Sequence, residues 1–479
     1  MMSALWTAFE AAAATGGTLG ARGPASDWHA DRLPEEDWAA SGLSIDTRTI
    51  RPGEVFVAVK GARDGHEFLS QAFERGAAAA LVSRAPAEVP EGKPLLFVQD
   101  TMGGLRALAE AARDRNFGRL IGVTGSAGKT SVKEMLRAAL APCGEVHAAE
   151  ASFNNHLGVP LTLAALPGSA DYGVFEMGMS AAGEIEELTR LVRPHVAIVT
   201  TVAAAHLEFF DGVEAIAEAK AEIVRGLRKG GTAVLPADNE FFGLLSERAR
   251  EHGVARIVSF GEAAGADARL TGYEWTGGAA RVTARVHDRD VAFTLAAPGR
   301  HQAVNALSVL AAAVAAGADV DRAISGLETF RPGGGRGARH EVAVGGRRVT
   351  LIDESYNANP ASMRASLRVL ADEPGAVRKL AVLGEMGELG PDGPALHASL
   401  APDVEAAGVD ALYTIGGGMA ALREAVAPAM RARHAAAAAD LEDDLTADLR
   451  DGDVVLFKGS NGTRVHALLA ALLHKAEEA

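Results

Sequence analysis

Cysteine is almost absent from this sequence, since Cys143 is the single cysteine in 479 residues. One cysteine excludes an intrachain disulfide and is typical of proteins that fold in a reducing compartment. Long apolar runs are also missing: the longest, residues 303–318, is too short and too rich in alanine to span a bilayer. Residues 1–17 contain no lysine or arginine and include Glu10, so they predict an amphipathic helix rather than a signal peptide. We therefore expect a cytoplasmic protein that does not cross a membrane.

Positive charge is also scarce. Lysine and arginine number 47 against 62 aspartates and glutamates, which gives a formal net charge of −15. This balance argues against nucleic acid as a partner, because proteins that bind nucleic acid present an excess of basic side chains. Small anions would need local binding sites, since screening over about 8 Å hides distant charges. With 48% hydrophobic and 23% charged residues, the chain otherwise has the composition of a soluble globular enzyme.

The alternation of short apolar runs with helical patterns predicts an α/β protein. At about 150 residues per domain the length indicates about three domains, and we place them at 1–115, 116–331 and 332–479. The first is predicted to be a smaller α/β domain, the second a parallel sheet of the P-loop ATPase type, and the third a Rossmann-like parallel sheet with right-handed crossovers. The expected strands are 54–59, 78–83, 94–99, 119–125, 171–178, 195–202, 232–238, 348–353, 379–384, 411–416 and 453–459. The expected helices include 103–115, 212–231 and 301–317, with a small antiparallel excursion at 255–297 and a linker at 331–340.

The segment "TGSAGKTS" (124–131) joins a predicted strand directly to a predicted helix. Gly125 and Gly128 would let backbone N–H groups face an anion at the positive end of the helix. Lys129 would then reach the β- and γ-phosphates, and Thr130 would offer its hydroxyl to Mg²⁺. The usual spacing of a phosphate loop requires glycine where Val123 stands. The segment is therefore either a shorter phosphate loop or a strand–helix turn that resembles one.

Polar residues follow several of the predicted strands. Glu176 lies at the tip of an apolar strand, where a carboxylate could hold Mg²⁺ beside a phosphate loop or simply be solvated. His206 follows the next strand and is a candidate ligand if a metal is near, or otherwise a structural histidine. Lys220 lies in a predicted helix, where lysine is ordinarily solvated.

A second polar cluster, "DESYNANPASM" (353–363), follows a predicted strand of the third domain. Its turn could present Asp353, Tyr356, Asn357 and Asn359 to a ligand, or it could be an ordinary Asx turn. Lys458 lies at the end of another strand, as a ligand contact or an exposed tip. Ligands of open parallel sheets bind beyond the carboxyl ends of the strands, so the recurrence of polar clusters there favours a binding site.

The order of the motifs "TGSAGKT", "FNNHLGVPLT", "FEMGMS", "AHLEFF", "AKAEI", "GRHQAVNAL", "DESYNANPASM", "GEMGELG" and "KGS" resembles that of the Mur ligases. The resemblance extends from "LSIDTRTIRPGEVFVAVKGARDGHEF" to "LFKGSNGTRV" and so covers nearly the whole chain. Members of this family have three domains and a short phosphate loop in which the first glycine comes three residues before the second. The resemblance therefore implies that 124–131 binds ATP together with Mg²⁺.

The segments "YNANP" and "GEMGELG" resemble the family members that join D-alanyl-D-alanine to UDP-N-acetylmuramoyl-tripeptide. The tetrapeptide "DNPR", expected in the diaminopimelate-adding relative, does not occur. The resemblance implies that the first domain binds the UDP substrate, the second binds ATP, and the third binds the dipeptide and closes over ATP through the linker. The implied reaction phosphorylates the carboxylate of the tripeptide, and the amine of the dipeptide then attacks the acyl phosphate. We expect a monomer.

The resemblance assigns roles residue by residue. ATP is expected to contact Gly125, Ser126, Ala127, Gly128, Lys129, Thr130, Ser131, Asn305, Arg336 and Asp353. The metal ligands would be Thr130, Glu176, His206 and a carbamylated Lys220, and the catalytic residues would be Lys129, Lys220 and His206. The substrates are expected at Ser44, Asp46, Arg48, Lys60, Asn154, Asn155, Tyr356, Asn357, Asn359 and Lys458. Relatives often have Asn at the position of Ala127, and Asp or Ser at that of Glu354.

Two other assignments stay open. Another Mur-type or folylpolyglutamate-type ligase would use a different acceptor. A P-loop motor, a kinase or an ATP-dependent binding module would hydrolyse ATP without an amino-acid acceptor, but would leave the first-domain motif and "YNANP" unexplained. No side chain stands out in the sequence as the general base for the incoming amine.

Overall fold

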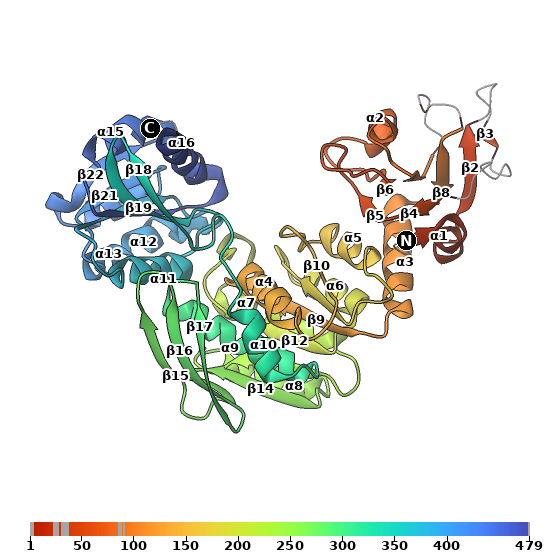
Figure 1. The fold of residues 1–479 in the computed structure, drawn as a ribbon, viewed down its shortest axis with the longest axis horizontal. Helices are drawn as coiled ribbons and strands as arrows, with labels where there is room; N and C mark the ends of the chain where they lie inside the picture. The colour runs from red at the N-terminus through yellow and green to blue at the C-terminus, as the bar shows by residue number, and fades with distance from the viewer. Residues whose placement is uncertain (1–3, 23–27, 30–37, 85–88, 90–91, 478–479) are drawn as a thin grey trace. The chain divides into compact units, whose positions relative to one another are not determined.

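The computed structural model describes residues 4–22, 28–29, 38–84, 89 and 92–477 (Figure 1). The chain is α/β throughout and forms two compact units. One comprises Met1–Gly122, Gly144–Gly178 and Glu186–His195, and the other Val123–Cys143, Met179–Ile185 and Val196–Ala479. The first three residues of the expected N-terminal helix lie outside the described residues. Of the helices described, none is both long enough and apolar enough to cross a membrane.

The N-terminal part contains a six-stranded sheet in the order β3-β2-β8-β7-β6-β5. Its strands are β2 (Thr18–Arg22), β3 (Trp28–His29), β5 (Gly42–Ser44), β6 (Glu54–Val57), β7 (Ala79–Val82) and β8 (Pro94–Phe97). β5 to β8 run parallel, and β2 is antiparallel to β3 and β8. The three strands expected here correspond to β6, β7 and β8. β2, β3 and β5 were not predicted; β3 and β5 have only two and three residues, and β2 lacks the apolar run that marks β6, β7 and β8.

Three helices and a small ribbon complete this part. They are α1 (Ala8–Thr15), α2 (Leu69–Glu74), α3 (Thr101–Arg115) and the antiparallel pair β1 (Trp6–Thr7) and β4 (Ala39–Ala40). α1 begins with a capping box, in which Thr7 accepts from the backbone N–H of Glu10 and Glu10 accepts from that of Thr7. Asp100 caps α3 by accepting from the N–H of Gly103.

The central sheet has nine strands in the order β10-β11-β9-β12-β13-β14-β15-β16-β17. They are β9 (Arg119–Thr124), β10 (Val146–Ala148), β11 (Tyr172–Glu176), β12 (Val196–Val199), β13 (Thr232–Pro236), β14 (Arg256–Gly261), β15 (Ala268–Trp275), β16 (Ala280–Val286) and β17 (Arg289–Leu295). The expected antiparallel excursion at 255–297 is confirmed from β15 onward. β14 instead pairs parallel with β13, because the helix before it returns the chain to the same edge of the sheet.

The helices of the central region are α4 (Lys129–Leu140), α5 (Gly158–Ala164), α6 (Glu184–Val192), α7 (Val213–Ala221), α8 (Phe242–Glu251), α9 (Arg300–Ala315) and α10 (Val320–Leu327). The helix expected at 212–231 is shorter in the structure. α7 ends at Ala221 and the chain tightens into a 3₁₀ helix, Glu222–Gly226, before a turn leads to β13.

The C-terminal sheet has six strands in the order β18-β19-β23-β20-β21-β22. They are β18 (Ala338–Val344), β19 (Arg347–Glu354), β20 (Arg378–Gly384), β21 (Ala411–Ile415), β22 (Arg431–Ala435) and β23 (Asp453–Lys458). The four strands expected here correspond to β19, β20, β21 and β23, and they run parallel. β18 was not predicted. It is antiparallel to β19, and it begins inside the expected linker at Ala338.

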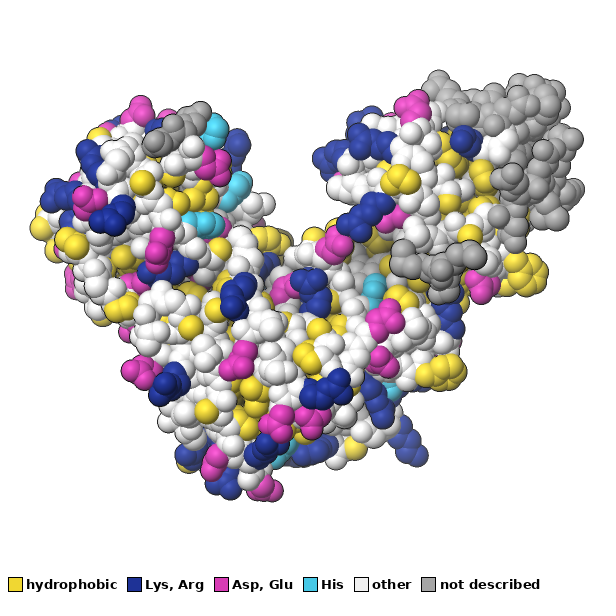
Figure 2. All heavy atoms as spheres, in the orientation of Figure 1, with side chains coloured by type: hydrophobic (Ala, Val, Ile, Leu, Met, Phe, Trp, Pro, Cys, Tyr) yellow, Lys and Arg dark blue, Asp and Glu magenta, His cyan; other side chains and the backbone are white. Residues whose placement is uncertain are grey.

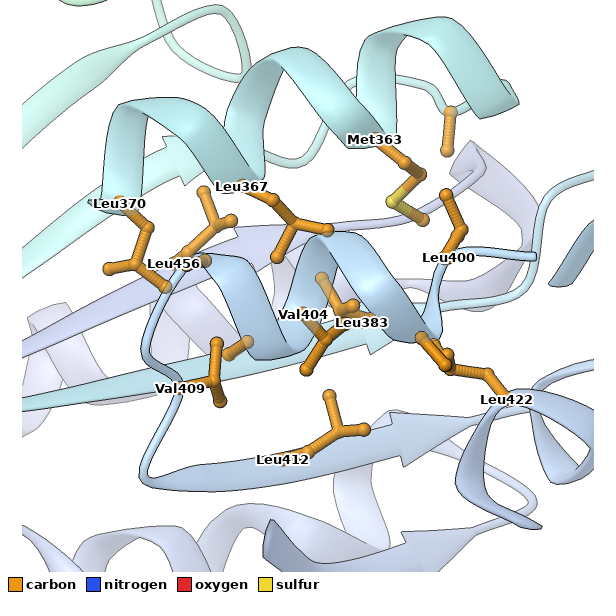
Figure 3. Packing of buried hydrophobic residues seen from close by; sticks show 14 of the residues in the cluster. Met363, Leu367, Leu370, Leu383, Leu400, Val404, Val409, Leu412, Leu422 and Leu456 are labelled. Carbon is orange, nitrogen blue, oxygen red and sulfur yellow. The ribbon is translucent and has the colours of Figure 1, made fainter. Parts of the chain in front are cut away.

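The C-terminal helices cover both faces of this sheet. They are α11 (Pro360–Ala371), α12 (Gly393–Ala398), α13 (Ala401–Ala406), α14 (Met419–Ala425), α15 (Glu442–Asp448) and α16 (Val465–Glu477). Successive residues of β20 point to opposite faces: Leu383 packs with Leu367 and Val404 from α11 and α13 (Figure 3), whereas Leu380 and Val382 belong to the cluster under α15 and α16. Burial on both faces explains the continuous apolar runs of these strands.

Candidate active site

The segment 124–131 has the backbone of a phosphate loop. Gly125 and Gly128 have φ of +150° and +82°, which side-chain-bearing residues rarely adopt. A Cβ on Gly125 would lie 1.9 Å from the Thr200 hydroxyl oxygen, so glycine is required there for space as well. Thr200 follows β12 and donates to the carbonyl of Ala127 at 2.5 Å. Gly128 caps α4, whose N-terminus therefore opens directly onto the loop.

The side chains of the loop are held from the same strand end. Ser126 donates through its hydroxyl to the carbonyl of Ala203 and accepts from the N–H of that residue, both at 2.9 Å. The ammonium of Lys129 donates to the carbonyl of Gly125 at 2.8 Å. Thr130 and Ser131 are buried in the first turn of α4. The segment 124–131 therefore joins β9 directly to α4 through a glycine turn, as the sequence predicts.

Asn305, on α9, lies beside the loop. A Cβ on Gly128 would lie 3.1 Å from the Asn305 amide nitrogen and 3.2 Å from its oxygen. The Asn305 amide also donates to the Gln302 side chain at 3.3 Å, one turn earlier on the helix. The structure thus brings Asn305 to the phosphate loop from a helix more than 170 residues later in the chain.

His206 and Lys220 form a second group near the loop. His206 has φ of +62°, and its Nδ1 is hydrogen-bonded to the Glu388 carboxylate. Burial lowers the pKa of His206, Glu388 opposes this, and the charges of Lys129 and Lys220 lower it further. Burial also places the pKa of Lys220 well below its ordinary value, with the charge of Lys129 acting in the same direction. Lys220 is only 2% exposed, so it is not the solvated helical lysine that its position in α7 suggested.

The turn 353–363 contacts the phosphate loop. The side-chain amide of Asn359 donates to the carbonyl of Ser126 at 3.1 Å, and its oxygen accepts from the N–H of Ser362 to cap α11. The neighbouring Asn357 accepts from the N–H of Ala358 at 2.9 Å. The turn is thus an Asx-type cap that also contacts the loop through Asn359. Its presentation of Asn359 to a ligand stays a prediction.

Asp353 fixes the end of the expected linker. One carboxylate oxygen accepts from the N–H of Gly335 at 2.6 Å and the other from the N–H of Ser355 at 3.1 Å. The guanidinium of Arg336 stacks on the ring of Tyr356 at 3.8 Å from its centroid. The linker is therefore held at Gly335 and Arg336, and its predicted freedom is limited to the residues before them.

Lys458 is buried at the end of β23 rather than exposed at a tip. Its ammonium donates to the carbonyl of Asn357 at 3.1 Å and lies 3.8 Å from the carboxylate of Glu354. Burial lowers the pKa of Lys458 and raises that of Glu354, while the charge of each opposes the shift of the other. The pair fixes the turn that carries Tyr356 and Asn357.

Glu176 has a separate set of partners. It lies at the end of β11, is 3% exposed, and accepts from the Asn154 amide at 2.8 Å and the Ser152 hydroxyl at 2.9 Å. Asn155 accepts from the N–H groups of Leu157 and Gly158, at the start of α5. The predicted residues Glu176 and Asn154 thus meet, and Asn155 has a local structural role.

The first-domain residues form a compact turn after β5. Ser44 accepts from the N–H of Asp46 at 3.2 Å, and Arg48 donates to both carboxylate oxygens of Asp46. This pairing is the main reason why the pKa of Asp46 is lowered. Lys60 lies after β6 and pairs through its backbone with Asp64. Ser44, Asp46 and Arg48 are therefore together, and Lys60 belongs to a different turn.

Several residues of these groups were not predicted individually. Thr200, Ser152 and Glu388 contact predicted site residues, and Glu354 pairs with one. Glu388 lies in "GEMGELG", so its segment was noted but its contact with His206 required the fold. Thr200 follows an apolar strand, and nothing in its own segment marks it as a contact of the loop. Its closeness to Gly125 is seen only in the structure.

Comparison with known proteins gives three family matches in chain order. Residues 40–115 match the model described as Mur ligase family, catalytic domain, residues 123–313 match the Mur ligase middle domain, and residues 338–461 match the Mur ligase, glutamate ligase domain. Together these matches include the first-domain turn, the phosphate loop and the Asn359 turn.

Similar proteins extend over nearly the full chain. A Bacillus subtilis (strain 168) protein named UDP-N-acetylmuramoyl-tripeptide–D-alanyl-D-alanine ligase is 32% identical over 91% of this chain and 94% of its own. One of the same name from Escherichia coli (strain K12) is 37% identical over 80% and 83%. A crystal structure of MurF from Acinetobacter baumannii aligns with a TM-score of 0.83, at 31% identity over 98% of this chain and 99% of that one. MurF ligase from Thermotoga maritima in complex with ADP aligns at 0.75, with 28% identity over 91% and 98%. The chain belongs to the Mur ligase family.

Proposed function

We propose that this protein is an ATP-dependent ligase that joins D-alanyl-D-alanine to UDP-N-acetylmuramoyl-tripeptide during peptidoglycan precursor synthesis. One observation carries the proposal. A fully formed phosphate loop, contacted by the "YNANP" turn, lies in a chain that matches relatives named for this reaction over most of both lengths. A P-loop motor or kinase would not account for that match.

The reaction has to make a carboxylate accept an amine. A free carboxylate repels a nucleophile and offers oxide as the leaving group, so the γ-phosphoryl group of ATP is first transferred to it. The loop N–H groups and the α4 N-terminus would bind the phosphates, and Lys129 would exchange the Gly125 carbonyl for a phosphate oxygen. This exchange places a positive charge where negative charge develops during the transfer.

The residues proposed to hold Mg²⁺ fit a hard cation in part. The Thr130 hydroxyl and the Glu176 carboxylate are oxygen donors, which Mg²⁺ prefers. Among the described residues, no three His, Cys, Asp or Glu side chains come together as a metal site. In the described ranges, side chains of these four types therefore do not form the Mg²⁺ site by themselves. Bound Mg²⁺ would supply neutralisation of the phosphoryl oxygens. A carbamate on Lys220 would add the missing anionic oxygens.

The environment of Lys220 supports its carbamylation. A carbamate forms only from the neutral amine, and an ordinary lysine is almost fully charged at neutral pH. Burial and the nearby charge of Lys129 both favour the neutral form of Lys220. His206, held by Glu388 through Nδ1, keeps its Nε2 available for a ligand. We retain both residues as proposed metal ligands.

The remaining assignments complete the proposal. Ser44, Asp46, Arg48 and Lys60 would bind the UDP substrate, and Tyr356, Asn357 and Lys458 the dipeptide side. The domain limits 1–115, 116–331 and 332–479, a monomeric state and a cytoplasmic location remain our predictions. The last follows from the substrates, because ATP and UDP-linked precursors are soluble cytosolic metabolites.

Mass spectrometry of the product tests the function. The purified protein is incubated with ATP, Mg²⁺ and UDP-N-acetylmuramoyl-tripeptide, with D-alanyl-D-alanine, single amino acids or glutamate as acceptors. We expect a mass gain of one dipeptide less water with D-alanyl-D-alanine alone. A gain with a single amino acid would assign another ligase of the family, and ATP hydrolysis without an acceptor would overturn ligation.

A further inference from the structure

A cavity of about 550 Å³ is lined by residues of β14, β15 and β16 and of the turns beside them. Figure 1 labels these strands in the central sheet. The volume of the cavity is within the range of small-molecule sites. The cavity is lined by Arg256, Arg269, Arg285 and His287, together with residues 264–267 and Asp288. None of these residues belongs to the phosphate loop or to the groups described above. The cavity therefore lies outside the residues proposed for the ligase reaction.

Two of the arginines face each other across the sheet. Arg269 on β15 is the direct register partner of Arg285 on β16. Like charges directly opposite on neighbouring strands are destabilising. On the face shown in Figure 2 basic and acidic side chains are interspersed, so a group of arginines is not the pattern of that face. Such an arrangement needs a compensating negative charge.

Carboxylates lie near these arginines, but among the described residues none is bound to them. In the part of the chain that the structure describes, Arg256, Arg269 and Arg285 form no ion pair; Arg269 donates to the carbonyl of Ala264 at 3.3 Å, and Arg256 contacts His287. Asp290 is the register partner of Arg285 on β17 but is not bound to it.

The cavity also contains two acids. Asp267 accepts from the N–H and the hydroxyl of Ser259 at 2.8 and 2.6 Å through one carboxylate oxygen. Asp288 lies in the hairpin turn that also holds His287. With Asp290, three carboxylates therefore lie near the three guanidinium groups, but in the described part of the chain none of them forms an ion pair with an arginine of the cavity.

His287 adds a directed donor. It occupies the turn between β16 and β17 with φ of +53°, and its N–H donates to the carbonyl of Asp267 at 2.6 Å. Its Nδ1 lies 3.4 Å from the guanidinium of Arg256, which can only donate, so Nδ1 acts as the acceptor there. The proton of the neutral ring is then on Nε2. That atom is buried and has no partner among the described residues.

We propose that this cavity binds a small phosphorylated anion. Guanidinium groups bind phosphate oxygens in pairs, and a phosphate between Arg269 and Arg285 would relieve their repulsion while Arg256 and the Nε2–H of His287 complete its contacts. The volume accommodates a ligand of drug-like size rather than an extended polymer.

Hydrogen–deuterium exchange with inorganic pyrophosphate as the probe tests this site. Peptides that cover 256–269 and 281–288 report the cavity, and peptides that cover 124–131 report the phosphate loop within the same sample. We expect saturable protection of the cavity peptides. In the double variant Arg269→Gln/Arg285→Gln this protection should require at least about tenfold more pyrophosphate, while the loop peptides respond as in the parent protein.

Arg281→Gln is the matched control. Arg281 lies on the same strand and face as Arg285 but opposite Glu274, outside the cavity. It should leave protection of the cavity peptides unchanged. Without the anion, the double variant should unfold at the same temperature as the parent protein or higher, because a repulsion is removed. Absence of protection at high millimolar pyrophosphate, protection that survives the double variant, or a lowered unfolding temperature without loss of binding would overturn the proposal.

Discussion

The ammonium of Lys129 lies 2.8 Å from a carbonyl oxygen of its own loop. The same charge lowers the pKa values of His206 and Lys220. One lysine therefore stabilises the loop, would bind phosphate, and helps to keep a neighbouring amine neutral. These functions depend on the position of the Lys129 ammonium group, which the sequence motif alone does not give.

Replacement of Lys129 tests the first part of this account. In Lys129→Ala we expect phosphate release with all substrates present to fall by at least about a hundredfold, because a charge aimed at the transferred phosphoryl group is lost. Far-ultraviolet circular dichroism should be unchanged, since a cap on one carbonyl is a small part of the fold. Lys229→Ala, at an exposed lysine, is the control. Normal turnover in Lys129→Ala would refute the role.

His301 gives a pH-dependent prediction at the same scale. Burial, with the charges of Lys458 and Arg368, lowers its pKa to about 4. Between pH 4 and the ordinary histidine pKa of about 6.5 the unfolded chain therefore binds a proton that the folded protein does not, so stability falls as the pH falls. We expect His301→Gln to reduce the pH dependence of the free energy of unfolding over this range by up to about 1.4 kcal/mol per pH unit. Urea unfolding at several pH values measures this free energy. Partial exposure of the His301 ring reduces the effect. If the free energy of unfolding depends on pH equally in both proteins, His301 is not the cause.

At the scale of elements, the linker shows how a glycine-rich segment can be partly rigid. Gly335 and Gly337 have φ of +75° and +99°, and both N–H groups donate to Asp353. The composition of 331–340 predicted a linker, but it did not indicate that the Asp353 carboxylate from β19 would hold Gly335. Any hinge motion is therefore expected in Gly333 and Gly334.

Two alanine substitutions separate the halves of this segment. A Cβ on Gly335 would lie 2.8 Å from the Cβ of Tyr356 in a left-handed conformation, whereas a Cβ on Gly333 meets nothing within 4 Å. We expect Gly335→Ala to lower the free energy of unfolding by about 2 kcal/mol and Gly333→Ala to change it by less than about 0.5 kcal/mol. Urea unfolding measures both. Equal losses in the two variants would show that the segment at Gly335 is no more rigid than the segment at Gly333.

At the scale of the whole chain, Glu373 connects elements from different regions. Its side chain is 1% exposed, accepts from the indole N–H of Trp275 on β15 at 3.1 Å, and pairs with Arg339 on β18. A buried carboxylate between a central strand and the end of α11 couples the unfolding of these regions. Arg339 also lies near Glu341, which is exposed.

Removal of this carboxylate should be costly. Glu373→Ala leaves a guanidinium and an indole N–H without their partner, and we expect a loss of about 3 kcal/mol in the free energy of unfolding. Glu341→Ala removes an exposed pair to the same arginine and should cost less than about 0.5 kcal/mol. Tryptophan fluorescence during urea unfolding measures both variants. A similar loss of unfolding free energy in the two variants would show that the buried carboxylate of Glu373 contributes no more to stability than the exposed one of Glu341.

The sequence by itself determined the elements whose pattern is local and repeated. Apolar runs buried on both faces marked β19, β20, β21 and β23, and the loop 124–131 was a candidate because its glycines, lysine and threonine lie close together in the sequence. Family membership followed from the order of short motifs. The short strands β2, β3 and β5 and the early end of α7 were not predicted, because pairing with neighbours, rather than local period, decides them.

Only the tertiary structure decided which separated residues meet. Asn359 reaches Ser126 across 233 positions and His206 reaches Glu388 across 182, and neither pair has a signal in its own segment. The burial of Lys220 and Lys458, and the facing arginines 269 and 285, likewise arise from packing and strand register. Electrostatic effects depend on distance and solvent access in three dimensions, which a one-dimensional pattern does not contain.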